Sequence, residues 1–359
     1  MQKIRLQRNG GETMTLKDIA KEAGVSISTV SRVINGNEHG AASKATRDRI
    51  WAVVRKNGYT PNISAQNLKR KTPLPDTSVK PLRYIDCLQA RTANPSTDPF
   101  FADLERALEQ EAFNNNYVVK HTFRPIDLNS PATPLRPSGD NVCGLVIFGR
   151  YLFTKQQLQL LTRAYKNIIY VGLNTLPFKC DQVVCDGYKA GLDAISYLLE
   201  LGHKKIAYIG EQNNECRFRA YKDALAYHNL PFSIRNTANV LQSTEGGHKG
   251  VQMLLKQNSD FSAVFCANDL TAIGAIKAFH EAKLHVPRDV SVISVDDIDL
   301  SQYMNPMLTT VHIPIEELGR QTARLLIDRI SGGHSLPMKV ELPFYIAKRD
   351  SCARYRKSR

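Results

Sequence analysis

From residue 82 onward, short apolar segments alternate with amphipathic ones over about 265 residues. Runs rich in β-branched and aromatic residues predict strands, and apolar residues three or four positions apart predict helices. The predicted strands span 84–88, 117–121, 144–148, 167–171, 182–185, 205–209, 263–267 and 291–295. The predicted helices between them span 101–114, 154–165, 189–201, 217–228, 244–257 and 269–282. Such alternation produces parallel sheets with helices on both faces, and its length favours two doubly wound subdomains.

The segment before residue 60 has a different, all-helical pattern. Its predicted helices span 16–23, 27–35 and 44–57. Thr15, with Asp18 three residues later, is close to a capping box for the first helix. Gly24 supplies a tight turn, and Ser26 caps the second helix. A helix, a glycine turn and a second helix form the helix-turn-helix arrangement, whose second helix enters the major groove of DNA.

The outer face of that second helix carries side chains suited to DNA. Ile27 and Ser28 lie at its N-terminal end, where contacts to base edges are made. Arg32 can donate two hydrogen bonds to one guanine. The residues able to donate to phosphates are Thr29, Ser31 and Asn35. The segment alone is also compatible with an ordinary helical hairpin on a protein surface.

The positive charge of the chain is concentrated at its two ends. The net charge is +14, and residues 1–72 carry 14 Lys or Arg against 5 Asp or Glu. Residues 348–359 carry 6 against 1, whereas the 275 residues between the two ends carry 28 of each sign. A basic end on a neutral body favours a polyanionic partner for that end.

Several classes of protein are disfavoured by what the sequence lacks. No stretch of about 20 apolar residues predicts a membrane span, and the basic N-terminus has no apolar run of a secretory signal. The seven cysteines are odd in number and contain no C-x-x-C pair, which argues against a zinc ribbon or a disulfide framework. We find no G-x-G-x-x-G after a strand, no P-loop and no G-x-S-x-G, so an enzyme is disfavoured too. We expect a cytoplasmic protein with no metal and no cofactor.

Residues 15–35, TLKDIAKEAGVSISTVSRVIN, resemble the headpiece signature of the lactose/galactose repressor (LacI/GalR) family of transcription regulators. Residues 58–62 and 64–69, GYTPN and SAQNLK, resemble that family's exit from its third helix and its hinge helix. The resemblance continues in the body at LGHKKIA, AND, VSVISVDD and LTTV. It implies a body similar to periplasmic sugar-binding proteins: two subdomains, three chain crossings and an effector in the cleft.

The resemblance gives the hinge a role on DNA. In the family the hinge folds on the operator, pairs with its twin and inserts a leucine into the minor groove; the matching residue here is Leu68, beside Lys69. An apolar wedge of this kind unstacks a base step and kinks the duplex. Further residues that the resemblance places at the DNA are Thr15, Tyr59, Asn62 and Ala65.

The same resemblance places Arg217, Asn268 and Asp296 in the effector site. Each lies at or just beyond the carboxyl end of a predicted strand, where ligands bind in this architecture. Carboxylates and guanidinium groups hold the vicinal hydroxyls of sugars. Arg219 is a competitor for the role of Arg217.

Four more residues are candidates by their position after a strand. They are Phe100 and Phe101 in the first strand–helix loop, Tyr151 after the third strand and Asp186 after the fifth. Aromatic rings can cover the apolar face of a sugar, although core packing is the more common role of an adjacent pair.

We therefore predict a helix-turn-helix domain at 14–62, a hinge and linker at 63–81, a two-lobed α/β body at 82–347 and a basic tail at 348–359. The predicted function is a homodimeric repressor of a sugar-utilisation operon, possibly one for galactosides. Its partners are a pseudo-palindromic, double-stranded operator and a small effector. A regulator that responds to a purine or another metabolite is the alternative, and a sugar-binding protein without a DNA role is a weaker one.

Overall fold

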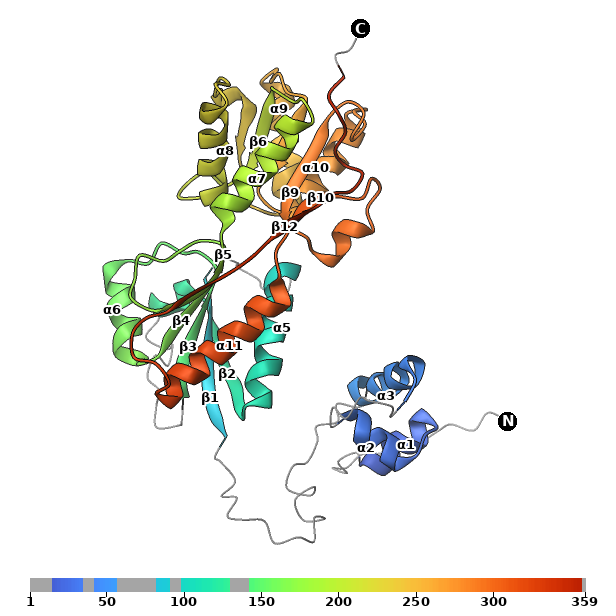
Figure 1. Cartoon of the computed structure of the whole chain (residues 1–359), viewed down its shortest axis with the longest axis vertical. Coiled ribbons are helices and arrows are strands. Elements are labelled where there is room, and N and C mark those ends of the chain that lie inside the picture. The colour runs from blue at the N-terminus through green and yellow to red at the C-terminus, as the bar shows by residue number, and fades with distance from the viewer. Residues whose placement is uncertain (1–14, 35–41, 57–81, 91–97, 130–141, 357–359) are drawn as a thin grey trace. The chain divides into compact units, whose positions relative to one another are not determined.

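The computed structural model describes residues 15–34, 42–56, 82–90, 98–129 and 142–356. The chain forms two compact units that divide after residue 78 (Figure 1). Within the described residues, the first unit contains three helices, and the second contains two six-stranded sheets with their helices. No helix in the described ranges is both long and apolar enough to cross a membrane.

The helices of the first unit are α1 (Leu16–Ala23), α2 (Ile27–Ile34) and α3 (Lys44–Lys56). The capping box is confirmed: the backbone N–H groups of Thr15 and Asp18 each donate to the other residue's side chain. Gly24 ends α1 at φ 65°, the left-handed conformation that glycine adopts without strain. Ser26 accepts from the Thr29 N–H at 3.1 Å and so begins α2.

A small apolar core joins these three helices. Its buried members are Ile19, Ala20, Ala23, Val30, Val33, Ile50, Val53 and Val54. They are the inward stripes that helical periodicity predicts, so the first unit follows directly from its local pattern.

The first sheet of the second unit is entirely parallel, with strand order β11-β5-β4-β3-β1-β2. Its strands are β1 (Arg83–Gln89), β2 (Tyr117–Phe123), β3 (Val142–Phe148), β4 (Ile168–Gly172), β5 (Asp181–Cys185) and β11 (Lys339–Leu342). The helices of this lobe are α5 (Pro99–Asn114), α6 (Lys155–Ala164), α11 (Ile315–Ser331) and the 3₁₀ helix η2 (Pro125–Asn129). Val146 and Phe148 pack with α5 and α11, whereas Leu145 and Ile147 pack with α6 on the opposite face.

The second sheet has the order β12-β10-β9-β8-β6-β7, and only β12 runs antiparallel to its neighbour. Its strands are β6 (Ile206–Gly210), β7 (Thr237–Asn239), β8 (Ala263–Cys266), β9 (Ser291–Asp296), β10 (Thr309–His312) and β12 (Tyr345–Ala347). The helices are α7 (Gly187–Glu200), α8 (Cys216–Tyr227), α9 (Thr244–Lys256) and α10 (Asp269–Glu281), with η3 (Ile234–Asn236) and η4 (Asp299–Gln302). The core places α7 and α8 on one face of the sheet and α9 and α10 on the other.

The chain crosses between the two lobes three times, as the family resemblance implies. It passes from β5 to α7, from β10 to α11 and from β11 to β12. Two lobes of doubly wound α/β structure are therefore confirmed.

The last part of the chain differs from the predicted pattern. Our predicted set lacks helix α11 and the strands β7, β10, β11 and β12. The last three of these strands are short, and they pair across long sequence separations. Residues 348–356, which the sequence sets apart as a basic tail, pack on the second lobe. Ser351 is buried and donates to the Val292 carbonyl at 2.6 Å, and the Tyr355 N–H donates to Leu201.

Candidate functional site

A cavity lies at the carboxyl ends of the strands, between the two lobes. The first lobe lines it with Asp98, Phe100, Phe101, Gly149, Arg150, Gly172, Leu173 and Asn174. The second lobe lines it with Arg217, Gln242, Asn268 and Asp296. The cavity has a volume of about 30 Å³, room for about two waters. Entry of a larger ligand therefore requires the walls to move apart.

Arg217 is the most tightly held group in the cavity. Its side chain is buried, its Nε donates to Glu215 at 2.7 Å, and its Nη1 donates to the Ala267 carbonyl at 2.7 Å. Nη2 donates to the Gln242 side chain at 3.1 Å. A guanidinium has five N–H donors, so each terminal nitrogen keeps one N–H beyond these three bonds. Burial lowers the pKa of Arg217, but the Glu215 carboxylate outweighs it and raises the pKa well above its usual value.

Glu215 organises this wall of the cavity. It is buried, and its carboxylate accepts from the Arg217 N–H at 3.2 Å and so caps α8. Its second oxygen accepts from Gln242 at 3.3 Å and lies 3.5 Å from Arg150. A buried carboxylate is stable only when its oxygens are paired in this way.

Asn268 and Asp296 complete the second-lobe wall. Asn268 caps α10 by accepting from the Thr271 N–H at 3.1 Å and the Thr271 hydroxyl at 2.6 Å. Asp296 ends β9 at φ 133° and is followed by Asp297 at φ 59°. Non-glycine residues at positive φ cost of order 1–3 kcal/mol and persist when their surroundings hold them.

The residue that holds this strained turn is Asp269, which is fully buried. One of its oxygens accepts from the Ser294 and Thr310 hydroxyls at 2.6 Å each, and the other accepts from the Ile298 N–H at 2.9 Å. Burial raises the pKa of Asp269 to about 7, although these hydrogen bonds favour the carboxylate. Asp269 thereby ties the ends of β9 and β10 to α10 beside the cavity.

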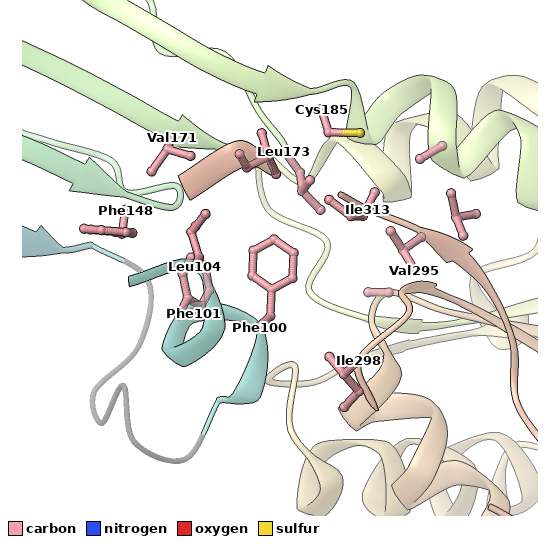
Figure 2. Close-up of a cluster of buried hydrophobic side chains, with 14 of the residues drawn as sticks. Phe100, Phe101, Leu104, Phe148, Val171, Leu173, Cys185, Val295, Ile298 and Ile313 are labelled. Atoms are coloured by element: carbon pink, nitrogen blue, oxygen red, sulfur yellow. The ribbon is translucent and has the colours of Figure 1, made fainter. Parts of the chain in front are cut away.

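The first-lobe wall is largely apolar. Phe100 and Phe101 both line the cavity and both belong to the buried core, with ring centroids 5.1 Å apart and edge-on. Figure 2 shows the Phe100 ring between the first-lobe residue Leu104 and the second-lobe residues Val295 and Ile298. Phe100 and Phe101 are therefore both core residues and part of the cavity wall. Gly172 lines the same wall, where a Cβ would approach the Tyr170 hydroxyl to 2.6 Å.

The structure does not bring two of the predicted residues to the cavity. The Tyr151 ring packs edge-on against Phe153, with centroids 4.9 Å apart. The carboxylate of Asp186 caps α7 by accepting from the N–H groups of Tyr188 and Lys189. Arg219 does not compete with Arg217, because it is exposed and its guanidinium lies over the half-buried Tyr188 ring, 4.6 Å from the ring centroid.

Sequence reasoning missed several polar residues of the site. Arg150 lies one position before the aromatic residue chosen after β3, and Asn174 follows β4 by the same strand-end rule. Gln242 follows the short strand β7, which the sequence pattern does not reveal. The sequence does carry a signal for Glu215: it is an acidic residue at the N-cap position of the predicted helix that holds Arg217.

In the first unit, α2 presents the predicted DNA-reading face to solvent. Ser28 and Arg32 are exposed, and Ile27 is 47% exposed. The hydroxyls of Thr29 and Ser26 hydrogen-bond at 2.8 Å, and Thr15 serves the cap of α1. The other predicted DNA contacts, Asn35, Tyr59, Asn62, Ala65, Leu68 and Lys69, lie outside the described residues.

Comparison with known families identifies both units. Residues 15–62 match the model of bacterial regulatory proteins of the lacI family, and residues 195–352 match a periplasmic binding protein-like domain. The HTH-type transcriptional regulator AscG of Escherichia coli K12 is 31% identical over 338 residues, 90% of this chain and 94% of that protein. The HTH-type transcriptional repressor PurR of Yersinia pestis is 30% identical over 349 residues, 94% of this chain and 97% of that one.

Solved structures agree. A complex of the transcriptional regulator CelR with cellobiose has a TM-score of 0.67 and 25% identity, and the match covers 94% of this chain and 99% of that one. A regulator from Enterococcus faecium with bound ribose has a TM-score of 0.67 and 28% identity, covering 76% of this chain and 100% of that one. The chain therefore belongs to the lacI family and is a DNA-binding transcriptional regulator with a ligand-binding body.

Proposed function

We propose that this regulator represses a sugar-utilisation operon and that a sugar bound between the lobes controls its affinity for the operator. The observation that carries the proposal is the buried Arg217. Three of its donors are fixed by protein acceptors, and its side chain lines the same cavity as Asn268 and Asp296. A guanidinium fork, an amide and a carboxylate supply the donors and acceptors that vicinal hydroxyls require.

The apolar first-lobe wall supports the same ligand class. Phe100, Phe101 and Leu173 offer a hydrocarbon surface opposite the polar residues of the second lobe. A pyranose ring has one apolar face and a polar rim, so it matches one wall of each kind. Cellobiose and ribose are the ligands of two similar structures, which adds support for a carbohydrate.

The ligand is expected to act by preferring one arrangement of the lobes. A ligand shifts an equilibrium only by its difference in affinity for the two states. We infer that the hinge at 63–81 transmits this preference to DNA and that the chain acts as a homodimer on a pseudo-palindromic site. In a dimer, two copies of α2 would read half-sites about one helical turn apart.

The effector is tested by thermal unfolding of the full chain with ribose, galactose, cellobiose and the purine bases adenine and guanine. A sugar at 100 times its Kd adds about 2.7 kcal/mol to stability and raises the Tm. A response to a purine base alone would favour the alternative effector class. A response to none of them would reject the effector proposal.

The DNA role is tested separately, by selection of bound sites from random duplexes followed by footprinting. We expect the full chain to protect a pseudo-palindromic site. Arg32→Ala should relax specificity at one base pair, at a cost of about 1–3 kcal/mol for the cognate site, whereas Lys69→Ala should mainly reduce the salt dependence. Equal losses on selected and random DNA for Arg32→Ala would contradict the base-reading role.

A further inference from the structure

One side chain from the first lobe reaches across to the second. Arg150 follows β3, and its Nη1 donates to the Asn213 carbonyl at 2.8 Å. Its Nη2 donates to Glu211 at 2.8 Å and lies 3.5 Å from Glu215. The guanidinium is 13% exposed, so these charge-assisted bonds are largely shielded from water.

The bridge is connected to the cavity through a shared acid. One oxygen of Glu215 takes the Nε–H of Arg217, and the other lies 3.5 Å from Arg150. The buried Glu215 carboxylate is neutralised by both arginines, so it couples their positions. If one arginine moves away, the other must neutralise the carboxylate alone. A ligand that shifts Arg217 therefore alters the bridge.

Arg150 also has a donor that the protein does not use. Its Nε is buried and has no hydrogen-bond partner within the part of the chain that the structure describes. Buried donors without an acceptor are rare because each carries a desolvation penalty. Arg150 lines the cavity, so the missing acceptor can be supplied by a molecule that enters there.

We propose that Arg150 has two roles: its terminal nitrogens tie the first lobe to the second, and its Nε–H binds an oxygen of the effector. The proposal rests on the cleft described under the proposed function and adds a residue to it. The oxygen belongs to a neutral hydroxyl or carbonyl, because the acids Glu211, Glu215 and Asp296 already neutralise the two arginines of the cavity region. Arg150 thus selects effectors that place an acceptor on the first-lobe side.

The bridge is tested without any ligand, by amide hydrogen exchange of the full chain. Arg150→Met, Glu211→Gln and the double variant form a cycle. Exchange in the segments around residues 149–151 and 211–215 should rise about 10-fold in Arg150→Met and less in Glu211→Gln. The second change should have no further effect in the Arg150→Met background. Unchanged exchange, or two effects that simply add, would overturn the bridge.

The effector contact is tested by calorimetric titration of ribose, galactose and cellobiose into the wild type and into Arg150→Lys. Lysine keeps the positive charge and can reach an acid of the second lobe. All its N–H donors lie on one nitrogen, so it cannot hold both the bridge and the effector oxygen. Affinity for the sugar that binds should fall about 10-fold to 100-fold. The matched control is Arg163→Lys on the exposed face of α6, which should bind like the wild type.

The outcomes separate this inference from the proposed function. Equal sugar affinity in Arg150→Lys and the wild type would overturn the effector contact while leaving the sugar site intact. If none of the three sugars binds the wild type, the sugar proposal fails for them, and the exchange cycle still decides whether Arg150 bridges the lobes.

Discussion

The two lobes share a fold but differ in where their most deeply buried ion pairs lie. In the second lobe, the buried ionic groups Arg217, Glu215 and Asp269 lie near the carboxyl ends of the strands, beside the cavity. In the first lobe, the buried acid Asp181 begins β5 and pairs with Arg329 and His334 at the amino ends. Apart from Arg150, Asp98 and Asn174, the first-lobe wall is apolar or glycine.

Because of this difference, we expect the two walls of the cavity to contribute unequally to ligand binding. Polar groups that are already hydrogen-bonded to protein need little reorganisation when a ligand arrives, so the second lobe supplies orientation and specificity. Apart from the proposed Arg150 contact, the first lobe supplies a surface that excludes water. The comparison therefore predicts that changes in the second-lobe wall have larger effects than changes in the first.

The largest effect is expected from Arg217→Met. Affinity for the sugar found in the unfolding screen should fall at least about 100-fold, because two charge-assisted donors are lost. The free energy of unfolding should fall by about 3–5 kcal/mol, because Glu215 stays buried without its main partner. Calorimetry and urea unfolding measure the two effects. Arg219→Met, an exposed change on the same helix, is the control; equal effects of the two variants would break the comparison.

A smaller loss is expected from Asp269→Ala in the same lobe. The hydroxyls of Ser294 and Thr310 and the Ile298 N–H lose their shared acceptor, so the free energy of unfolding should fall by about 3 kcal/mol. Urea unfolding followed by circular dichroism tests this. Asp299→Ala, on the exposed part of η4, should stay within about 0.5 kcal/mol of the wild type. A loss no larger than that of Asp299→Ala would remove Asp269 from the support of the cavity.

The first-lobe wall is tested by Phe100→Leu. A smaller apolar side chain should cost about 1 kcal/mol in unfolding free energy and reduce sugar affinity less than 10-fold. Calorimetric titration with the sugar measures the change in affinity, and urea unfolding measures the change in stability. Phe113→Leu, whose side chain is 54% exposed on the same helix, is the matched control. A loss of affinity as large as that of Arg217→Met would show that the two walls contribute equally.

The smallest effect is expected at the far edge of the first lobe, from pH. Hydrogen bonds to Asp328 and Asp181, at 2.5 and 3.0 Å, raise the pKa of His334 above 6.5. The stabilisation from this histidine is fully present below its unfolded pKa and is lost as pH rises through the higher folded value. Unfolding free energies measured on both sides of pH 6.5 should show less dependence on pH in His334→Gln. An unchanged profile in His334→Gln would reject the assignment.

Local pattern was sufficient for the elements that are stabilised by near neighbours in sequence. The capping box of Thr15 and Asp18, the turn at Gly24 and the inward stripes of α1 and α2 follow from spacing alone. The eight strands predicted from apolar runs are confirmed within a few residues. All but the edge strand β2 lie inside their sheets, where parallel strands are buried on both faces. The family resemblance, with strand-end position in support, pointed to Arg217, Asn268 and Asp296, all of which line the cavity.

Tertiary structure alone decided which side chains meet at the cleft. Strand-end position predicted Tyr151 and Asp186 as well, but one packs against Phe153 and the other caps α7. The bridge from Arg150 to Glu211 joins residues 61 positions apart on different lobes, and β11 and β12 pair with strands far earlier in the chain. Periodicity and capping describe interactions within a few residues, so the sequence determined the helix-turn-helix unit, the alternating body and its family. The partners of each cavity group depend on how the three chain crossings bring together segments that are distant in sequence. Local sequence patterns carry no information about such long-range contacts.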